Sequence, residues 1–174
     1  MSEASQHPGD WSEQHERILK SWGENAICLQ RIHDHCHHRF RRRSIMLTLP
    51  VIIMSTVTGT ANFSMGSFDV TLRERISVII GTVNLLAGMI TTISQYLRLS
   101  ELSEGHRVAA LAYGKLQRNV GSELNLPRFE RSVSGLHAVK ATRGEMDRLA
   151  EQSPNIDENT TNWFTNRYPN VDLQ

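Results

Sequence analysis

Two long stretches without a charged side chain dominate the hydropathy pattern of this chain. Residues 45–63 (IMLTLPVIIMSTVTGTANF) and residues 76–97 (ISVIIGTVNLLAGMITTISQYL) contain no Asp, Glu, Lys, Arg or His. As α-helices they would reach about 28 and 33 Å at about 1.5 Å per residue, close to the thickness of a bilayer hydrocarbon core. The pattern therefore predicts two membrane-spanning helices.

The alternative is a pair of buried helices in a soluble bundle. Several polar residues make the first stretch less apolar than a typical span: Ser55, Thr56, Thr58, Thr60 and Asn62. A central soluble helix of this length, however, usually carries charge where it reaches the surface. The rest of so short a chain could hardly wrap two such helices, so the pattern favours the membrane interpretation.

The distribution of Lys and Arg predicts the orientation. Cytoplasmic flanks of membrane spans are enriched in these residues, and they gather before the first stretch and after the second, whereas the connecting loop has only Arg73 and Arg75. We therefore expect an integral membrane protein with both termini in the cytoplasm. The first forty residues contain no apolar segment of the kind found in a signal peptide. The flanking basic residues are Arg31, Arg39, Arg41, Arg42, Arg43, Arg98, Arg107, Lys115 and Arg118.

Helical periodicity extends beyond the two apolar stretches. Apolar residues recur at three- and four-residue steps over residues 11–43, which predicts an amphipathic cytoplasmic helix opened by a capping box of Asp10 and Glu13. Residues 98–125 have no helix breaker, so we expect them to continue the second span without interruption. Residues 128–174 predict C-terminal cytoplasmic helices, the first of them over 128–152, and residues 1–10 a flexible N-terminus.

The predicted fold class is all-α. Residues 44–97 form a two-span transmembrane hairpin, and the long cytoplasmic helical extensions on either side of it form a bundle. No single copy of the chain fills such a bundle well, which favours a homo-oligomer.

Small and polar residues in the second span follow one another at alternating steps of four and three, which places them on one helix face. One interpretation is close helix packing, because small residues let backbones approach and hydroxyl or amide groups bond across the interface. The other is a ring of copies that turns this face toward an aqueous pore. Both remain open. The second-span series is Ser77, Gly81, Asn84, Gly88, Thr91 and Gln95, and a similar series in the first span, interrupted by Ile52, is Thr48, Ser55, Gly59 and Asn62.

Basic side chains next to the spans are candidates for contact with lipid headgroups or for the mouth of a pore. Anionic lipid contributes about 1 kcal/mol per basic residue at the membrane surface. These residues are Arg39, Arg41, Arg42, Arg43 and Arg98. The whole chain has 19 Lys and Arg against 18 Asp and Glu, so its charge gives no indication of a nucleic-acid partner.

A histidine cluster precedes the first span: His33, His35, His37 and His38. On a helix, His33 with His37 and Asp34 with His38 have the four-residue spacing that lets two side chains reach one zinc ion. The same residues also fit a polar collar at the headgroup level or a group that titrates near neutral pH and gates a pore. We expect no metal site. No phosphate-binding loop or nucleophile triad is present, so we expect neither a cofactor nor an enzyme.

The chain resembles the SLATT group of two-transmembrane proteins. The resemblance rests on Trp11 and Trp22 in the leading helix, the span TLPVIIMSTVTGTANF, the span GTVNLLAGMITTISQYL and its continuation SELSEGHRVAALAYGKLQRNV. The stretch RGEMDRLAEQSPNI is similar to relatives in large DNA viruses. The resemblance implies a pore-forming effector that works as a homo-oligomer in a membrane.

We therefore expect a homo-oligomeric membrane pore or ion channel whose second span lines the pathway, with membrane lipids and permeating ions as its other partners. The alternative is a nonconducting, membrane-anchored helical scaffold that recruits a cytoplasmic partner.

Overall fold

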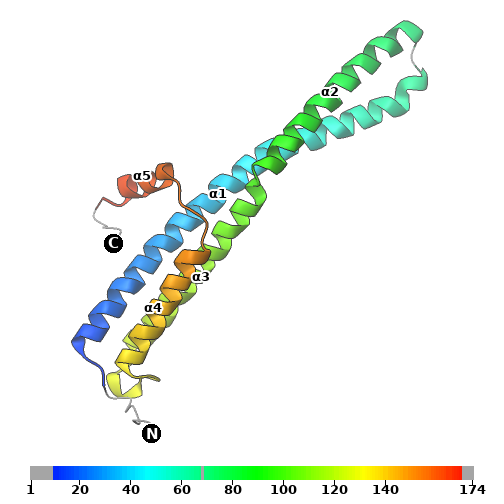
Figure 1. Ribbon diagram of the computed structural model, residues 1–174. Helices are drawn as coiled ribbons and strands as arrows, with labels where there is room; N and C mark the ends of the chain where they lie inside the picture. Colours follow the sequence, from blue (N-terminus) through cyan, green and yellow to red (C-terminus); the bar gives the residue numbers. More distant parts are fainter. Residues whose placement is uncertain (1–9, 68, 170–174) are drawn as a thin grey trace. The chain divides into compact units, whose positions relative to one another are not determined.

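The computed structural model describes residues 10–67 and 69–169, and these residues form an all-α fold, as the sequence predicts (Figure 1). The longest helix, α1, runs through Pro50 without interruption. The elements in chain order are α1 (Glu13–Ser64), the 3-10 turn η1 (Met65–Ser67), α2 (Val70–Tyr96), α3 (Leu99–Asn125), the 3-10 turn η2 (Arg128–Glu130), α4 (Gly135–Gln152) and α5 (Glu158–Arg167).

The chain divides into two compact units. One, which we call the hairpin, comprises His38–Ser103; the other, which we call the bundle, comprises the described residues up to His37 and from Glu104 onward. In the hairpin, the second half of α1 and the whole of α2 lie side by side and antiparallel (Figure 1).

The two long helical stretches, Glu13–Ser67 and Val70–Asn125, are long and apolar enough to cross a membrane. Only 6% and 11% of their most apolar windows are buried. A central helix of a soluble protein is mostly covered by its own chain. The remaining residues among 10–67 and 69–169 do not cover these windows.

From Ser44 to Ala61 on α1, Gly59 apart, and from Ile76 to Ser94 on α2, the buried or half-buried residues of the hairpin recur at alternating steps of three and four. An average step of 3.5 residues is that of left-handed coiled coils, in which two helices stay in contact along one line. We call these positions the contact seam. They are Ser44, Leu47, Val51, Met54, Thr58 and Ala61 on α1, and Ile76, Ile80, Val83, Ala87, Ile90 and Ser94 on α2.

The prediction that the second span continues without interruption was wrong. Between α2 and α3 the chain leaves the helix, and Arg98 takes a φ of 48°, a conformation that costs about 1–2 kcal/mol for a residue with a Cβ. The inward-facing residues on either side of the break are Ser94, which is half-buried, and Leu99, which is buried. They are five residues apart, a longer step than the alternation of three and four provides. The break therefore resets which face of the helix is turned inward.

In the bundle, α1, α3 and α4 share one apolar core. Three aliphatic side chains of this core are nearly inaccessible to solvent: Leu19, Leu116 and Val120. A Cβ at Gly135 would clash with Nδ1 of His15 and lie 3.1 Å from the Asp10 carbonyl oxygen, so a larger residue there would displace the His15 ring. The remaining buried members of this core are Trp11, Ala26, Tyr113, Ala138 and Leu149.

The start of α1 differs from the predicted capping box of Asp10 and Glu13. Ser12 caps the helix instead: its Oγ accepts a hydrogen bond from the His15 N–H at 3.2 Å. In return, Nδ1 of His15 accepts from the Ser12 N–H at 3.4 Å, so the histidine takes the place that glutamate has in a capping box. Trp11 precedes the helix and is buried, and its indole N–H donates to the Val133 carbonyl at 2.9 Å.

The returning helix begins at Gly135 and not at residue 128, with Ser134 as its cap. The loop before this helix is bound to α1 through Glu16. The Glu16 carboxylate accepts a hydrogen bond from Arg131 at 2.6 Å and another from Arg128 at 2.9 Å. These hydrogen bonds, the one from Arg128 foremost, lower the pKa of Glu16 to about 2. The predicted end of this helix at residue 152 is confirmed. A further helix, α5, follows it and contains Trp163 and Phe164.

Candidate functional site

The small and polar series of the second span occupies one exposed face of α2. Each of its residues directly follows a residue of the contact seam, and a step of one residue turns about 100° around a helix. All six residues are exposed in the single chain. The side of α2 that contacts α1 is therefore the apolar side formed by the seam residues. The small and polar residues lie on the adjacent side of the same helix.

The residues of the first-span series also directly follow seam residues. They are Thr48, Ser55, Gly59 and Asn62, of which Gly59 is half-buried and the other three are exposed. Seen from one end, antiparallel helices turn in opposite senses, and their seams point toward each other. A step of one residue from the seam therefore ends on the same side of the hairpin for both helices.

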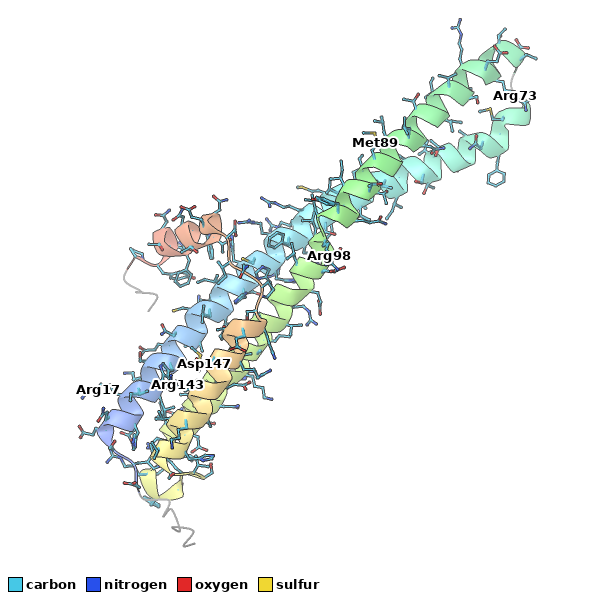
Figure 2. The ribbon with its side chains drawn as sticks, viewed as in Figure 1. Arg17, Arg73, Met89, Arg98, Arg143 and Asp147 are labelled. Carbon is cyan, nitrogen blue, oxygen red and sulfur yellow. The ribbon has the colours of Figure 1, made fainter. Side chains whose placement is uncertain are left out.

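The two series thus lie on one surface, which we call the polar face. Ile45 and Ile52 also directly follow seam residues and are its large apolar members. The opposite surface consists of the residues that directly precede the seam. Most of these are large and apolar and half or more exposed, and Met89, labelled in Figure 2, is one of them. We call this surface the apolar face, and its large members are Met46, Ile53, Val57, Ile79, Leu86, Met89 and Ile93.

The glycines of the polar face are next to open space in the single chain. A Cβ added at Gly59, Gly81 or Gly88 would meet nothing within 4 Å. Small residues permit close approach of helix backbones, but the hairpin does not use these three for that purpose. Within the described residues, nothing packs closely against this face at these three positions.

Asn84 is the polar group nearest the middle of the second span. Its side-chain Oδ1 lies 3.0 Å from the hydroxyl of Thr58, which also donates to the Met54 carbonyl at 2.9 Å. A side-chain amide has two N–H donors as well as its carbonyl, so Thr58 satisfies only part of it. In the part of the chain that the structure describes, no other group bonds this amide.

The structure separates the four histidines of the cluster. His33 is buried in the bundle, and its Nδ1 lies 2.8 Å from Nδ1 of His106 on α3. Burial first, and the neighbouring His106 second, lower the pKa of His33 to about 4. His35 stacks on Trp163 of α5 with ring centroids 3.6 Å apart.

The other two histidines have different surroundings. His37 is half-buried in the bundle and His38 is exposed on the hairpin. Across residues 10–67 and 69–169, no three His, Cys, Asp or Glu side chains are arranged to hold a metal ion. His106, which the sequence analysis did not single out, is the histidine that His33 contacts, and no sequence pattern indicates this pairing.

The basic side chains lie near the start of the hairpin and at the α2–α3 break. Arg41, Arg42 and Arg43 are exposed. The guanidinium of Arg39 lies 5.4 Å from the ring centroid of Phe40. Arg98, labelled in Figure 2, forms an ion pair with Glu101 at 2.9 Å.

No protein-family model, curated protein or solved structure matches this chain.

Proposed function

We propose that this chain assembles into a homo-oligomeric membrane pore. In this assembly the hairpin crosses the bilayer with both termini on the cytoplasmic side. The apolar face contacts lipid or sealing helices, and the polar face is turned toward neighbouring copies and a central water path. The observation that carries the proposal is the two-sided hairpin, with small and polar residues on one face and large apolar residues on the other.

The apolar face supports membrane insertion. In water, a soluble monomer rarely exposes an apolar patch larger than a few hundred Å², yet large side chains such as Met46 and Val57 are 73% and 62% exposed along the whole hairpin. Lipid tails would cover this surface. The absence of charged residues over 45–63 and 76–97 is consistent with that environment.

The polar face supports assembly around water. An unsatisfied polar group in hydrocarbon costs several kcal/mol, and the Asn84 amide has donors that its own chain leaves unmatched. A neighbouring copy or pore water supplies the missing partners. Neutral hydroxyl and amide groups in a pore wall replace part of an ion's hydration shell, which is the chemistry of Ser77, Thr91 and Gln95. The resemblance to the SLATT group supports the same assignment.

The proposal is tested with purified protein in planar bilayers. Unitary currents are expected from the wild type, and Asn84→Leu is expected to reduce them, because it replaces a polar wall group at mid-membrane by a bulky apolar one. Thr82→Leu is the matched control. Thr82 is also an exposed polar residue of α2, but its hydroxyl bonds the Val78 carbonyl of its own helix and it lies among the residues of the apolar face.

Wild-type currents that Asn84→Leu changes and Thr82→Leu does not would support the polar face as the pathway. Stable oligomers that never conduct would refute the pore and favour a nonconducting membrane scaffold. Equal effects of the two variants would refute the assignment of the polar face.

A further inference from the structure

A pocket opens in the hairpin where α2 ends and α3 begins. It has a volume of about 460 Å³ and lies between the start of the apolar part of α1 and the break at Arg98. This volume is within the range of small-molecule sites, about 300–1,000 Å³.

One wall of the pocket is apolar and another carries hydroxyl groups. Leu47 and Val51 of α1 form part of the apolar wall. On the polar side, the hydroxyls of Ser44 and Ser100 lie 2.9 Å apart. The Ser94 hydroxyl also lines the pocket, and its buried oxygen has no hydrogen-bond partner in the described part of the chain. Such a pocket suits a molecule that is apolar at one end and rich in hydrogen-bonding groups at the other.

Two opposite charges, Arg98 and Glu101, also line the pocket, together with Leu99 and the polar-face residues Thr48, Thr91 and Gln95. Their ion pair is solvent-exposed, with side chains 70% and 67% accessible, and exposed pairs of this kind contribute little to stability. Both side chains are therefore available to a ligand. An arginine pairs with phosphate oxygens, and a carboxylate accepts hydrogen bonds from an ammonium group. A ligand that carries both charges fits this lining better than one with a single charge.

We propose that this pocket binds the headgroup of a phospholipid that carries a phosphate and a primary ammonium, as in phosphatidylethanolamine. The phosphate contacts Arg98 and the Ser94 hydroxyl, the ammonium contacts Glu101, and the start of an acyl chain lies along Leu47 and Val51. Because Thr48, Thr91 and Gln95 also line the pocket, the lipid lies at the cytoplasmic end of the polar face, between neighbouring copies and outside the water path. The inference rests on the proposed membrane insertion, because Arg98 directly follows the second apolar stretch and thereby reaches headgroup depth.

The test is lipid retention by the full chain in nanodiscs made of equal parts phosphatidylethanolamine, phosphatidylcholine and phosphatidylglycerol. Native mass spectrometry of the released protein counts the bound lipids of each class. We expect phosphatidylethanolamine to be retained about tenfold over the other two, a factor that matches one charge-assisted contact. Phosphatidylcholine lacks ammonium N–H donors, and phosphatidylglycerol lacks the positive charge.

Variants assign the two contacts. Arg98→Gln is expected to abolish the retention of phosphatidylethanolamine. Glu101→Gln is expected to remove its advantage over phosphatidylglycerol while retaining a bound phospholipid. Arg73→Gln, at the opposite end of the hairpin (Figure 2), is the control and is expected to leave the pattern unchanged.

Equal retention of the three lipids by the wild type, or an unchanged preference in Glu101→Gln, would overturn the proposal. Free phosphoethanolamine is added in a separate arm. If it displaces the lipid adduct at millimolar concentration, a soluble compound and not a lipid is the ligand. A chain that does not enter nanodiscs refutes membrane insertion itself, which is distinguishable from a chain that inserts but binds no preferred lipid.

Discussion

The buried pair of His33 and His106 predicts that the bundle loses stability in mild acid. Both side chains are almost completely buried, at 1% and 0% exposure, and the two facing Nδ1 atoms lie 2.8 Å apart. Only one hydrogen fits between them, so at least one ring presents an unprotonated Nδ1. From α3, the ring of Tyr113 also covers His33, stacked at 5.6 Å between centroids.

The sign and size of the effect follow from the pKa of His33, which is about 4 in the folded chain against 6.5 ordinarily. The folded chain binds this proton less tightly than the unfolded chain. The bundle therefore has its full stability, as far as His33 is concerned, above about pH 6.5, where this side chain is neutral in both states. That stability is lost progressively as the pH falls toward 4. The difference between the two pKa values corresponds to about 3 kcal/mol in total, of which about 2 kcal/mol is lost between pH 7 and pH 5.

Tryptophan fluorescence measures this effect in the bundle alone, because Trp11, Trp22 and Trp163 are the three tryptophans of the chain and all lie there. Denaturant unfolding of the detergent-solubilised full chain is compared at pH 7 and pH 5. His33→Asn keeps a hydrogen-bonding group near His106 but removes the titration, so it should remove most of the pH dependence.

His137→Gln, an exposed position on α4, is the control and should keep the pH dependence of the wild type. The reasoning is refuted if the wild type is equally stable at both pH values. It is also refuted if His33→Asn retains the full dependence.

Two further predictions concern single polar contacts. Thr58→Val removes the hydroxyl that reaches Asn84 and should destabilise the hairpin by about 0.6–1.7 kcal/mol, measured by unfolding in detergent followed by circular dichroism. The hydroxyl of Thr56 bonds only its own helix, so Thr56→Val should destabilise the hairpin less. Equal destabilisation by the two variants would argue against the cross-helix contact. Glu16→Gln removes the carboxylate beside buried Arg131 and should cost the bundle about 1.5–3 kcal/mol by tryptophan fluorescence. Because the Glu16 pKa is lowered from 4.5 to about 2, its stabilising effect is present above 4.5 and lost as the pH falls toward 2, so the wild type should lose stability in that range and the variant should not.

Much of the hairpin is predictable from the sequence, because its determinants are local. The absence of charge over two long stretches and the step of four and three in the polar series are visible in the residues themselves. The seam beside that series is less visible, since Ile80, Val83 and Ala87 are apolar like the residues of the apolar face. Only contact with α1 distinguishes the two apolar surfaces.

The break at Arg98 has no local signal. Residues 96–101 contain neither proline nor glycine, and a helix through them violates no propensity rule. The structure turns both Ser94 and Leu99 inward, although they are five residues apart on the chain, and an unbroken helix does not meet this requirement. This requirement comes from the packing of the two long helices against each other, which sequence periodicity in one segment does not contain.

The pairing of His33 with His106 could not be predicted from the sequence either. The two residues are 73 positions apart, and the histidines around His33 drew attention to neighbours on the same helix. The four-residue spacing of His33 and His37 predicts a shared ligand site only if both side chains turn outward. In the structure His33 turns inward to α3, so tertiary packing decides the role that local spacing left open.

Cysteine accessibility along α2 tests the central proposal most directly. In a chain with Cys28 and Cys36 changed to alanine, single cysteines replace Asn84 or Gly88 on the polar face, and Leu86 or Met89 on the apolar face. Each protein is reconstituted in liposomes and treated with a charged methanethiosulfonate reagent. A pore predicts rapid modification at 84 and 88 and protection at 86 and 89, whereas equal modification at all four positions, or protection of all four, would contradict a polar face turned toward water inside a membrane.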